Sequence, residues 1–127
     1  MSLPFPDNHF DAITMGYGLR NIVDRGQALK ELHRVLRPGR RAAILDFNHS
    51  NDILVDAFQG FALEHLVVPV ARLYGLEDEY KYLRPSIENF PCGAEQERLG
   101  RNSGFATVRH YEIGFKLMGI LLCQKGR

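Results

Sequence analysis

The feature that most constrains the fold is an amphipathic helical pattern between two short apolar segments. Residues 10–17 have the composition of a strand, and residues 42–47 form a continuous apolar run that is typical of a strand buried on both faces. Between them, apolar residues recur at spacings of three and four over 25–36, which predicts a helix capped by Asp24 and ended by Arg37-Pro38-Gly39. A strand, a helix and a strand in this order predict a parallel crossover.

The rest of the chain predicts three helices and a closing hairpin. The first helix begins after Asn51 or Asp52 and ends or kinks at Pro69, and further helical patterns lie around 77–89 and 94–102. Two closing runs are joined by a turn at Gly114 and have the pattern of a β-hairpin, over Phe105–Glu112 and Lys116–Cys123. These elements predict a single α/β domain over 1–127, with a mixed sheet of about four strands that ends in an antiparallel hairpin.

Charge and cysteine content exclude several classes of protein. Sixteen basic residues against 15 acidic ones give a net charge of +1, so no strong basic field favours nucleic-acid binding. The cysteines, Cys92 and Cys123, cannot form a disulfide scaffold, and no His, Cys, Asp or Glu grouping has the spacing of a metal site. No apolar run approaches the roughly 20 residues that span a bilayer, which leaves at most peripheral membrane contact.

Several motifs carry a resemblance to known enzymes. The run Leu3-Pro4-Phe5-Pro6-Asp7-Asn8 and the strand after it resemble the stretch of S-adenosylmethionine-dependent methyltransferases that leads into their fourth strand. Gly16-Tyr17-Gly18-Leu19-Arg20-Asn21 narrows the resemblance to the UbiE/MenG family, the C-methyltransferases of ubiquinone and menaquinone biosynthesis. Together with Asp46-Phe47-Asn48 and Val67–Ala71, this block is most similar to the cyanobacterial and plastid branch, which methylates the naphthoquinone ring of the phylloquinone precursor.

The resemblance implies a Rossmann-like class I methyltransferase fold, of which this chain matches the carboxyl-terminal half, strands four to seven with their helices. The amino-terminal half of that fold carries a glycine-rich loop and an acidic residue that holds the cofactor's ribose, and neither has a counterpart here. We therefore expect 1–127 to be a partial domain cut from something longer, which binds S-adenosylmethionine weakly or not at all and is incompetent alone. The alternative is a non-catalytic truncated paralogue that acts as an interaction or dimerisation module. Because unpaired strand edges recruit other strands, we expect self-association through the edge of the first strand.

The catalytic residues implied by the resemblance are Arg20 and Asn21. A quinol carbon becomes nucleophilic when the adjacent hydroxyl loses its proton, so the site needs a base or a cation that stabilises the oxyanion. Arginine, with a pKa above about 12, is a poor base. We assign the oxyanion-stabilising role to Arg20 and a positioning role to Asn21; the alternative for Arg20 is a surface ion pair with Asp24.

The cofactor-binding residues implied by the resemblance fall in two groups. Gly16 and Tyr17 end the first strand, where a glycine permits close approach of the backbone and an aromatic ring can pack along the cofactor. The alternatives are that Gly16 is a loop hinge and that Tyr17 belongs to the core. Leu3, Pro4 and Phe5 resemble the segment that flanks the adenine.

The expected substrate is a lipid-soluble quinol, with a location in the cytoplasm or at the membrane surface of a bacterium, or in a plastid. Asn48 and His49 follow the second strand and lie on its ligand side; His49 is a candidate base or, alternatively, an exposed residue at the start of the next helix. Phe58 and Phe61 belong to an apolar stripe with Leu54 and Leu66. That stripe packs on the sheet or forms a wall for a prenyl or phytyl tail, and both can hold along different sides of one helix.

Overall fold

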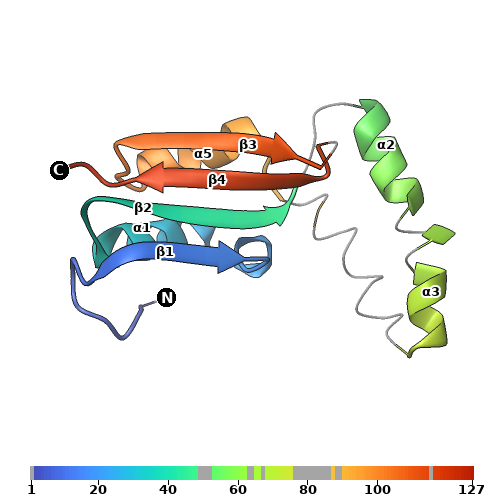
Figure 1. Cartoon of the computed structure of the whole chain (residues 1–127), viewed down its shortest axis with the longest axis horizontal. Coiled ribbons are helices and arrows are strands. Elements are labelled where there is room, and N and C mark those ends of the chain that lie inside the picture. Colours follow the sequence, from blue (N-terminus) through green and yellow to red (C-terminus); the bar gives the residue numbers. More distant parts are fainter. Residues whose placement is uncertain are drawn as a thin grey trace.

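A mixed four-stranded sheet forms the centre of the structure, a computed structural model that describes residues 2–48, 53–62, 65–66, 68–75, 87, 90–114 and 116–127. The strands are β1 (Phe10–Gly16), β2 (Leu36–Phe47), β3 (Thr107–Ile113) and β4 (Met118–Gln124), in the order β1-β2-β4-β3 (Figure 1). β1 runs parallel to β2, whereas β4 is antiparallel to both β2 and β3. The predicted crossover, mixed sheet and closing hairpin are confirmed.

Two helices cover one face of this sheet. α1 (Arg25–Val35) connects β1 to β2, and α5 (Gly93–Asn102) precedes β3 (Figure 1). Asp24 caps α1 as predicted, because its Oδ1 accepts a hydrogen bond of 3.0 Å from the backbone N–H of Gln27. The core between the helices and the sheet is built from apolar side chains, chiefly Ala28, Leu29, Leu32, Ala42, Ile44, Phe105, Val108, Leu121 and Cys123.

The start of β2 differs from the prediction. β2 begins at Leu36, directly after α1, and not at residue 42. Leu36 pairs with Phe10 but Arg41 pairs with Ala12, so the residues between them bulge out of the ladder. Gly39 lies in this bulge with a φ of +78°, and its N–H bonds to the carbonyls of the last residues of the chain. The proline–glycine pair therefore ends the helix as predicted, while the chain continues as an irregular strand.

The prediction that β2 is buried on both faces is wrong. Ala42, Ile44 and Asp46 are buried beneath the helices, whereas Ala43, Leu45 and Phe47 on the opposite face are only half-buried. The register places those residues beside Leu122, Ile120 and Met118 of β4. Both faces of β2 are apolar, and a continuous apolar run by itself does not reveal that only one of them is covered.

The middle of the chain also departs from the prediction. α2 (Ile53–Ala62) and α3 (Val68–Leu73) are separate helices, and Pro69 lies in the first turn of α3, where a proline is tolerated, so it does not end a helix. Both helices stand beyond the end of the sheet (Figure 1). The predicted helix at 77–89 lies almost wholly outside the described residues, as do Asn51 and Asp52. In the described part, no helix is long and apolar enough to cross a membrane.

Candidate functional site

The carboxyl ends of β1 and β2 lie side by side because the two strands are parallel, and ligands of open α/β sheets bind at such ends. Gly16 ends β1, and Tyr17 continues the ladder through a 2.8 Å hydrogen bond from its N–H to the carbonyl of Leu45. Tyr17 then adopts a φ of +57°, which turns the chain into the short 3-10 helix η1 (Leu19–Asn21). This turn carries Arg20 and Asn21 across to the end of β2.

Arg20 forms a buried ion pair there. Its Nη1 donates to Oδ1 of Asp46 at 2.7 Å, and its backbone N–H donates to Oδ2 of the same carboxylate at 3.0 Å. The side chains are only 9% and 3% exposed, respectively. The guanidinium carbon lies 5.3 Å from the centre of the Phe47 ring, and the Arg25 guanidinium donates to the Arg20 carbonyl at 3.0 Å. The expected alternative, a surface pair of Arg20 with Asp24, is therefore wrong.

One donor of Arg20 has no protein acceptor. Its Nε is buried and makes no hydrogen bond, although a buried polar group without a partner costs free energy. Asp46 holds the guanidinium, so the unpaired Nε is a fixed but buried donor, which a ligand reaches only if the atoms that cover it move. The catalytic assignment of Arg20 stays a prediction, but its position is that of a preorganised hydrogen-bond donor.

Tyr17 and Gly16 are both accessible at this end of the sheet. The Tyr17 side chain is 47% exposed, so its alternative placement in the core is wrong, and its ring lies 5.5 Å from the Phe47 ring. A Cβ atom added at Gly16 would meet nothing within 4 Å. Asn21 lies beside them and its Nδ2 reaches the Tyr17 carbonyl at 3.5 Å. The space beside Gly16 is open, so a ligand can approach the backbone there.

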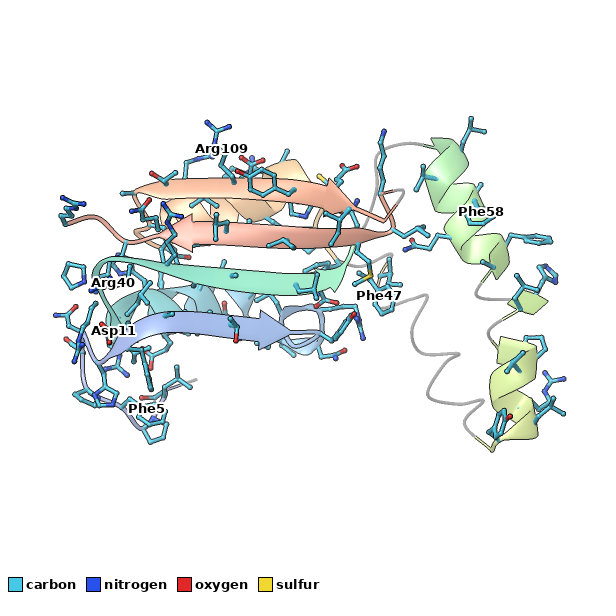
Figure 2. The ribbon with its side chains drawn as sticks, in the orientation of Figure 1. Phe5, Asp11, Arg40, Phe47, Phe58 and Arg109 are labelled. Atoms are coloured by element: carbon cyan, nitrogen blue, oxygen red, sulfur yellow. The ribbon has the colours of Figure 1, made fainter. Side chains whose placement is uncertain are left out.

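Asn48 is held by the fold at the end of β2, and its expected role in substrate binding stays a prediction. It is 1% exposed, and its Nδ2 donates to the Lys116 carbonyl at 2.8 Å, which ties the end of β2 to the loop before β4. Its Oδ1 is buried without a hydrogen-bond partner. His49 lies outside the described residues. Phe58 lies on α2, beyond the end of the sheet (Figure 2), and both it and Phe61 are exposed, so packing of their stripe on the sheet is wrong.

The amino-terminal segment forms a second, separate feature. The Leu3 N–H donates to Glu31 at 2.8 Å, and Arg34 donates to the carbonyls of Leu3 and Phe5 at 3.1 and 2.9 Å. Hydrogen bonds from Arg34 and from the Leu3 N–H lower the pKa of Glu31 to about 2. The segment is thereby held against α1, and Pro4 lies within it.

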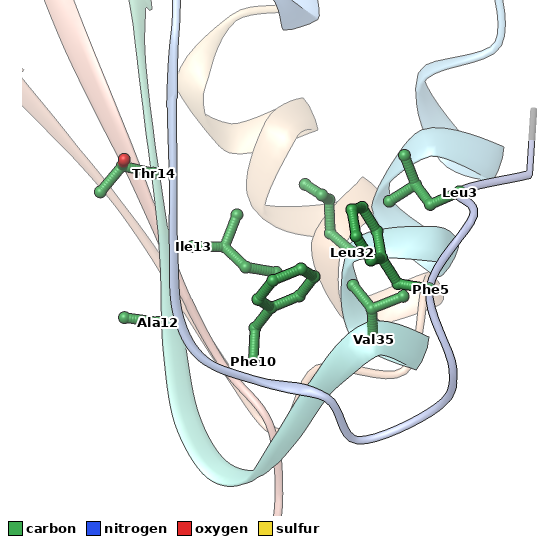
Figure 3. Close-up of a pocket in the computed structure, with 8 residues that line it drawn as sticks. All are labelled: Leu3, Phe5, Phe10, Ala12, Ile13, Thr14, Leu32 and Val35. Atoms are coloured by element: carbon green, nitrogen blue, oxygen red, sulfur yellow. The ribbon is translucent and has the colours of Figure 1, made fainter.

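An apolar pocket of about 240 Å³ opens between this segment, β1 and α1. Figure 3 shows the aromatic and aliphatic side chains pointing toward one another, while Ala12 and Thr14 lie on the other side of the strand. The pocket is lined by Leu3, Phe5, Phe10, Ala12, Ile13, Thr14, Leu32 and Val35. It lies along β1 from Phe10 to Thr14, and the expected binding role of Leu3, Pro4 and Phe5 stays a prediction.

The sequence reasoning missed Asp46 as a member of the site. It is the one charged residue within the apolar run 42–47, and charged side chains are rarely buried without a partner. That signal could have predicted a buried cation nearby. Among the described residues, no three His, Cys, Asp or Glu side chains gather as metal ligands would.

Comparison of the sequence with known proteins identifies the family to which the chain is similar. The model of the ubiE/COQ5 methyltransferase family matches residues 1–125. The 2-phytyl-1,4-naphtoquinone methyltransferase of Nostoc punctiforme is 52% identical over 98% of this chain and 54% of its own length. The chloroplastic 2-phytyl-1,4-beta-naphthoquinone methyltransferase of Arabidopsis thaliana is 50% identical over 98% of this chain and 48% of its own. The chain thus spans about half the length of these curated relatives.

Solved structures agree on the fold. A SAM dependent methyltransferase from Aquifex aeolicus superposes with a TM-score of 0.60 and 20% identity, over 96% of this chain and 49% of that one. A SAM-dependent methyltransferase from Thermotoga maritima gives a TM-score of 0.65 and 18% identity, over 98% and 60% of the two chains. At these identities the comparison shows the α/β methyltransferase fold alone.

Proposed function

This chain belongs to the ubiE/COQ5 methyltransferase family, and from that premise we propose that it carries the carboxyl-terminal half of an S-adenosylmethionine-dependent C-methyltransferase. The proposed substrate is a prenylated quinol, most simply the phytyl-substituted naphthoquinol related to the compound in the names of its relatives. The observation that carries the proposal is the buried, oriented Arg20 beside the accessible Gly16 and Tyr17 at the ends of two parallel strands.

In this proposal, the residues at the strand ends hold and polarise the quinol. When bound, S-adenosylmethionine supplies an electrophilic methyl group. Gly16 leaves room for close approach, and the exposed Tyr17 ring packs along the cofactor. A quinol oxygen that reached the buried Nε of Arg20 through a local movement would give this donor its missing acceptor and gain a cation beside its developing negative charge. The Asn21 side chain donates a hydrogen bond to the Tyr17 carbonyl and so stabilises the turn that carries Arg20.

We propose further that this chain alone binds the cofactor weakly and does not transfer methyl groups. The chain matches about half of each curated relative, and the glycine-rich loop and ribose-binding carboxylate expected of the fold have no counterpart in its sequence. The protein would act at a membrane surface of a bacterium or a plastid, where a quinol with a lipid tail resides.

Methyl transfer to demethylnaphthoquinol in detergent tests the function. We expect activity when this chain is fused to the amino-terminal half of the Nostoc punctiforme relative, and none from this chain alone. In the fusion, Gly16→Ala should weaken cofactor binding without loss of stability, because the added Cβ meets nothing within 4 Å. Gly126→Ala, where the Cβ lies 3.6 Å from that of Ala106, is the matched control. A fusion that folds and binds the cofactor but never methylates a quinol would refute the proposed reaction.

A second candidate function is an interaction module, favoured by the position of β1. β1 is the first strand of the sheet order and pairs with β2. In the described part of the chain, no strand pairs with the outer edge of β1, so this edge is available to a partner strand. Sedimentation over a wide concentration range tests this candidate: self-association should weaken in Thr14→Lys, which places a charge on β1. If the chain is a monomer at every concentration, it is not a module that self-associates through β1.

A further inference from the structure

The ring of His110 fills a space that two glycines leave open. His110 lies on β3 and is half-buried beneath α5. A Cβ atom added at Gly93, the first residue of α5, would collide with Nδ1 of His110, and one added at Gly119 of β4 would lie 2.5 Å from Nε2. Real Cβ atoms do not come this close to another heavy atom, so an alanine at either position would displace the ring. The imidazole therefore occupies this place because both neighbours lack a side chain.

A buried oxygen without a partner lies beside that ring. Oδ1 of Asn48 makes no hydrogen bond, although the residue is only 1% exposed. The Cβ position of Gly119 that lies 2.5 Å from Nε2 of His110 also lies 3.5 Å from this oxygen. The ring nitrogen and the amide oxygen therefore approach each other over Gly119. A buried acceptor that lacks a donor costs free energy, and the imidazole can supply one.

We propose that His110 is a positioning residue, which holds the side-chain amide of Asn48 through a hydrogen bond from Nε2–H to Oδ1. Rotation of either side chain brings the donor to the acceptor and gives the buried oxygen the partner that it lacks. An amide has one donor end and one acceptor end. With Oδ1 bonded to His110, the donor Nδ2 faces the Lys116 carbonyl, to which it bonds at 2.8 Å. His110 thus sets the direction in which the amide points.

The start of α5 selects the form of the His110 ring that can donate to Asn48. Nδ1 lies against Gly93 in the first turn of α5, where backbone N–H groups lack acceptors within the helix and no side chain caps them. A lone pair on Nδ1 suits these donors, whereas a proton there would face them and the positive end of the helix dipole. The proton of the neutral ring therefore belongs on Nε2. Burial lowers the pKa of His110, although the carboxylates of Glu112 and Glu97 act to raise it, so the ring is neutral at neutral pH.

The Asn48 amide is important for the candidate site because Asn48 joins three elements at the end of β2. Its side chain and its backbone N–H bond to carbonyls of the loop before β4 at 2.8 and 2.9 Å, and its own carbonyl accepts from Gln59 on α2 at 3.4 Å. Asn48 lies two residues after Asp46, the partner of Arg20. His110 therefore acts on methyl transfer through the end of β2 and without touching the substrate, a consequence that rests on the proposed function.

Nitrogen NMR of the full chain tests the hydrogen bond without any measurement of activity. The signal of a ring nitrogen shows whether that nitrogen carries a proton, and the spectrum of His110→Gln identifies which signals belong to His110. We expect one neutral tautomer, with the proton on Nε2. This proton should exchange with water about tenfold more slowly than the ring proton of His9, which is exposed. A proton on Nδ1, or a mixture of both tautomers, would overturn the proposal.

A double-variant cycle in urea measures whether His110 and Asn48 depend on each other. His110→Phe keeps a ring of similar shape but removes the donor, and Asn48→Ala removes the acceptor. We expect the double variant to lower the urea midpoint by less than the sum of the two single shifts. His33→Phe is the matched control, because His33 is also half-buried but packs against Phe105, before the start of β3. Its shift should add to that of Asn48→Ala, and additive shifts for His110→Phe would contradict the proposed bond.

Methyl transfer by the fusion with the amino-terminal half tests the positioning role. His110→Phe should lower kcat about tenfold without weakening cofactor binding, because the end of β2 is no longer held in place. His110→Gln, which keeps an N–H donor, should restore most of this loss, and His33→Phe should leave kcat unchanged. An active fusion in which His110→Phe has no effect on kcat would refute the positioning role. A fusion that is inactive before any substitution would instead count against the proposed function, while the NMR result for His110 would stand.

Discussion

Removal of the Asp46 carboxylate is the sharpest test of how the candidate site is held together. The carboxylate accepts three hydrogen bonds, from Nη1 and the backbone N–H of Arg20 at 2.7 and 3.0 Å and from the N–H of Phe47 at 2.8 Å. Asp46 is 3% exposed, so water cannot replace these bonds without local opening. Breaking a buried pair by removing one partner costs about 3–5 kcal/mol, because the remaining charge is left uncompensated.

We therefore expect Asp46→Ala to lower the free energy of unfolding by about 3–5 kcal/mol. Urea denaturation followed by circular dichroism measures this, and with a slope of about 1–3 kcal/mol per molar the midpoint should fall by at least about 1 M. Arg20→Met should cost less, since Asp46 would keep both backbone N–H donors. The double variant should lose less than the sum of the single ones, because it removes both charges.

Two results would refute this reasoning. A loss below about 1 kcal/mol in Asp46→Ala would have the size typical of an exposed ion pair, which contradicts the burial of both side chains. Additive losses in the double-variant cycle would show that Arg20 and Asp46 do not depend on each other, whatever the distance between them.

Three further outcomes are expected. The pKa of Glu31 is lowered from its ordinary value of 4.5 to about 2, chiefly because Arg34 hydrogen bonds to it. The stability that this carboxylate contributes is therefore complete above pH 4.5 and is lost as the pH falls toward 2. Glu31→Gln should flatten that part of a plot of melting temperature against pH. Gly119→Ala should lower the free energy of unfolding in urea by about 1–3 kcal/mol. The reason is that the added Cβ would lie 2.5 Å from Nε2 of His110. Burial raises the pKa of the Cys123 thiol to about 12. Maleimide at mildly alkaline pH should therefore label this thiol only after urea unfolds the chain, and mass spectrometry would detect the label.

The parts of the fold that sequence predicted well are those set by local patterns. Asp24 caps α1 through a residue three positions away, and the apolar spacing in α1 selects the face that packs on the sheet. The crossover from β1 to β2 follows from the order of these elements. Each of these signals lies within a few residues of the structure that it determines, so no knowledge of distant segments is needed.

The parts that sequence could not predict depend on what lies opposite a residue in space. Arg20 is separated from Asp46 by an entire helix, and nothing near Arg20 in the sequence distinguishes that partner from the closer Asp24. The stripe of Phe58 and Phe61 has the same spacing whether it faces a core or faces outward. Its direction was set by Gln59, whose bonds reach the end of β2 and the loop before β4. A polar residue opposite an apolar stripe is ordinary in sequence and becomes informative only when its partner is known.

The ion pair also changes how Arg20 is best understood as a functional residue. A long arginine side chain that was free in solution would lose conformational entropy on meeting a ligand, and its charge would be screened by water. Here Asp46 and the Phe47 ring already hold the guanidinium, and burial removes the surrounding water. The contact that makes Arg20 appear structural therefore also orients the Nε donor before any ligand arrives. In this site a stabilising ion pair and a preorganised anion donor are two consequences of one arrangement, with Nη1 serving the pair and the buried Nε left without a protein acceptor.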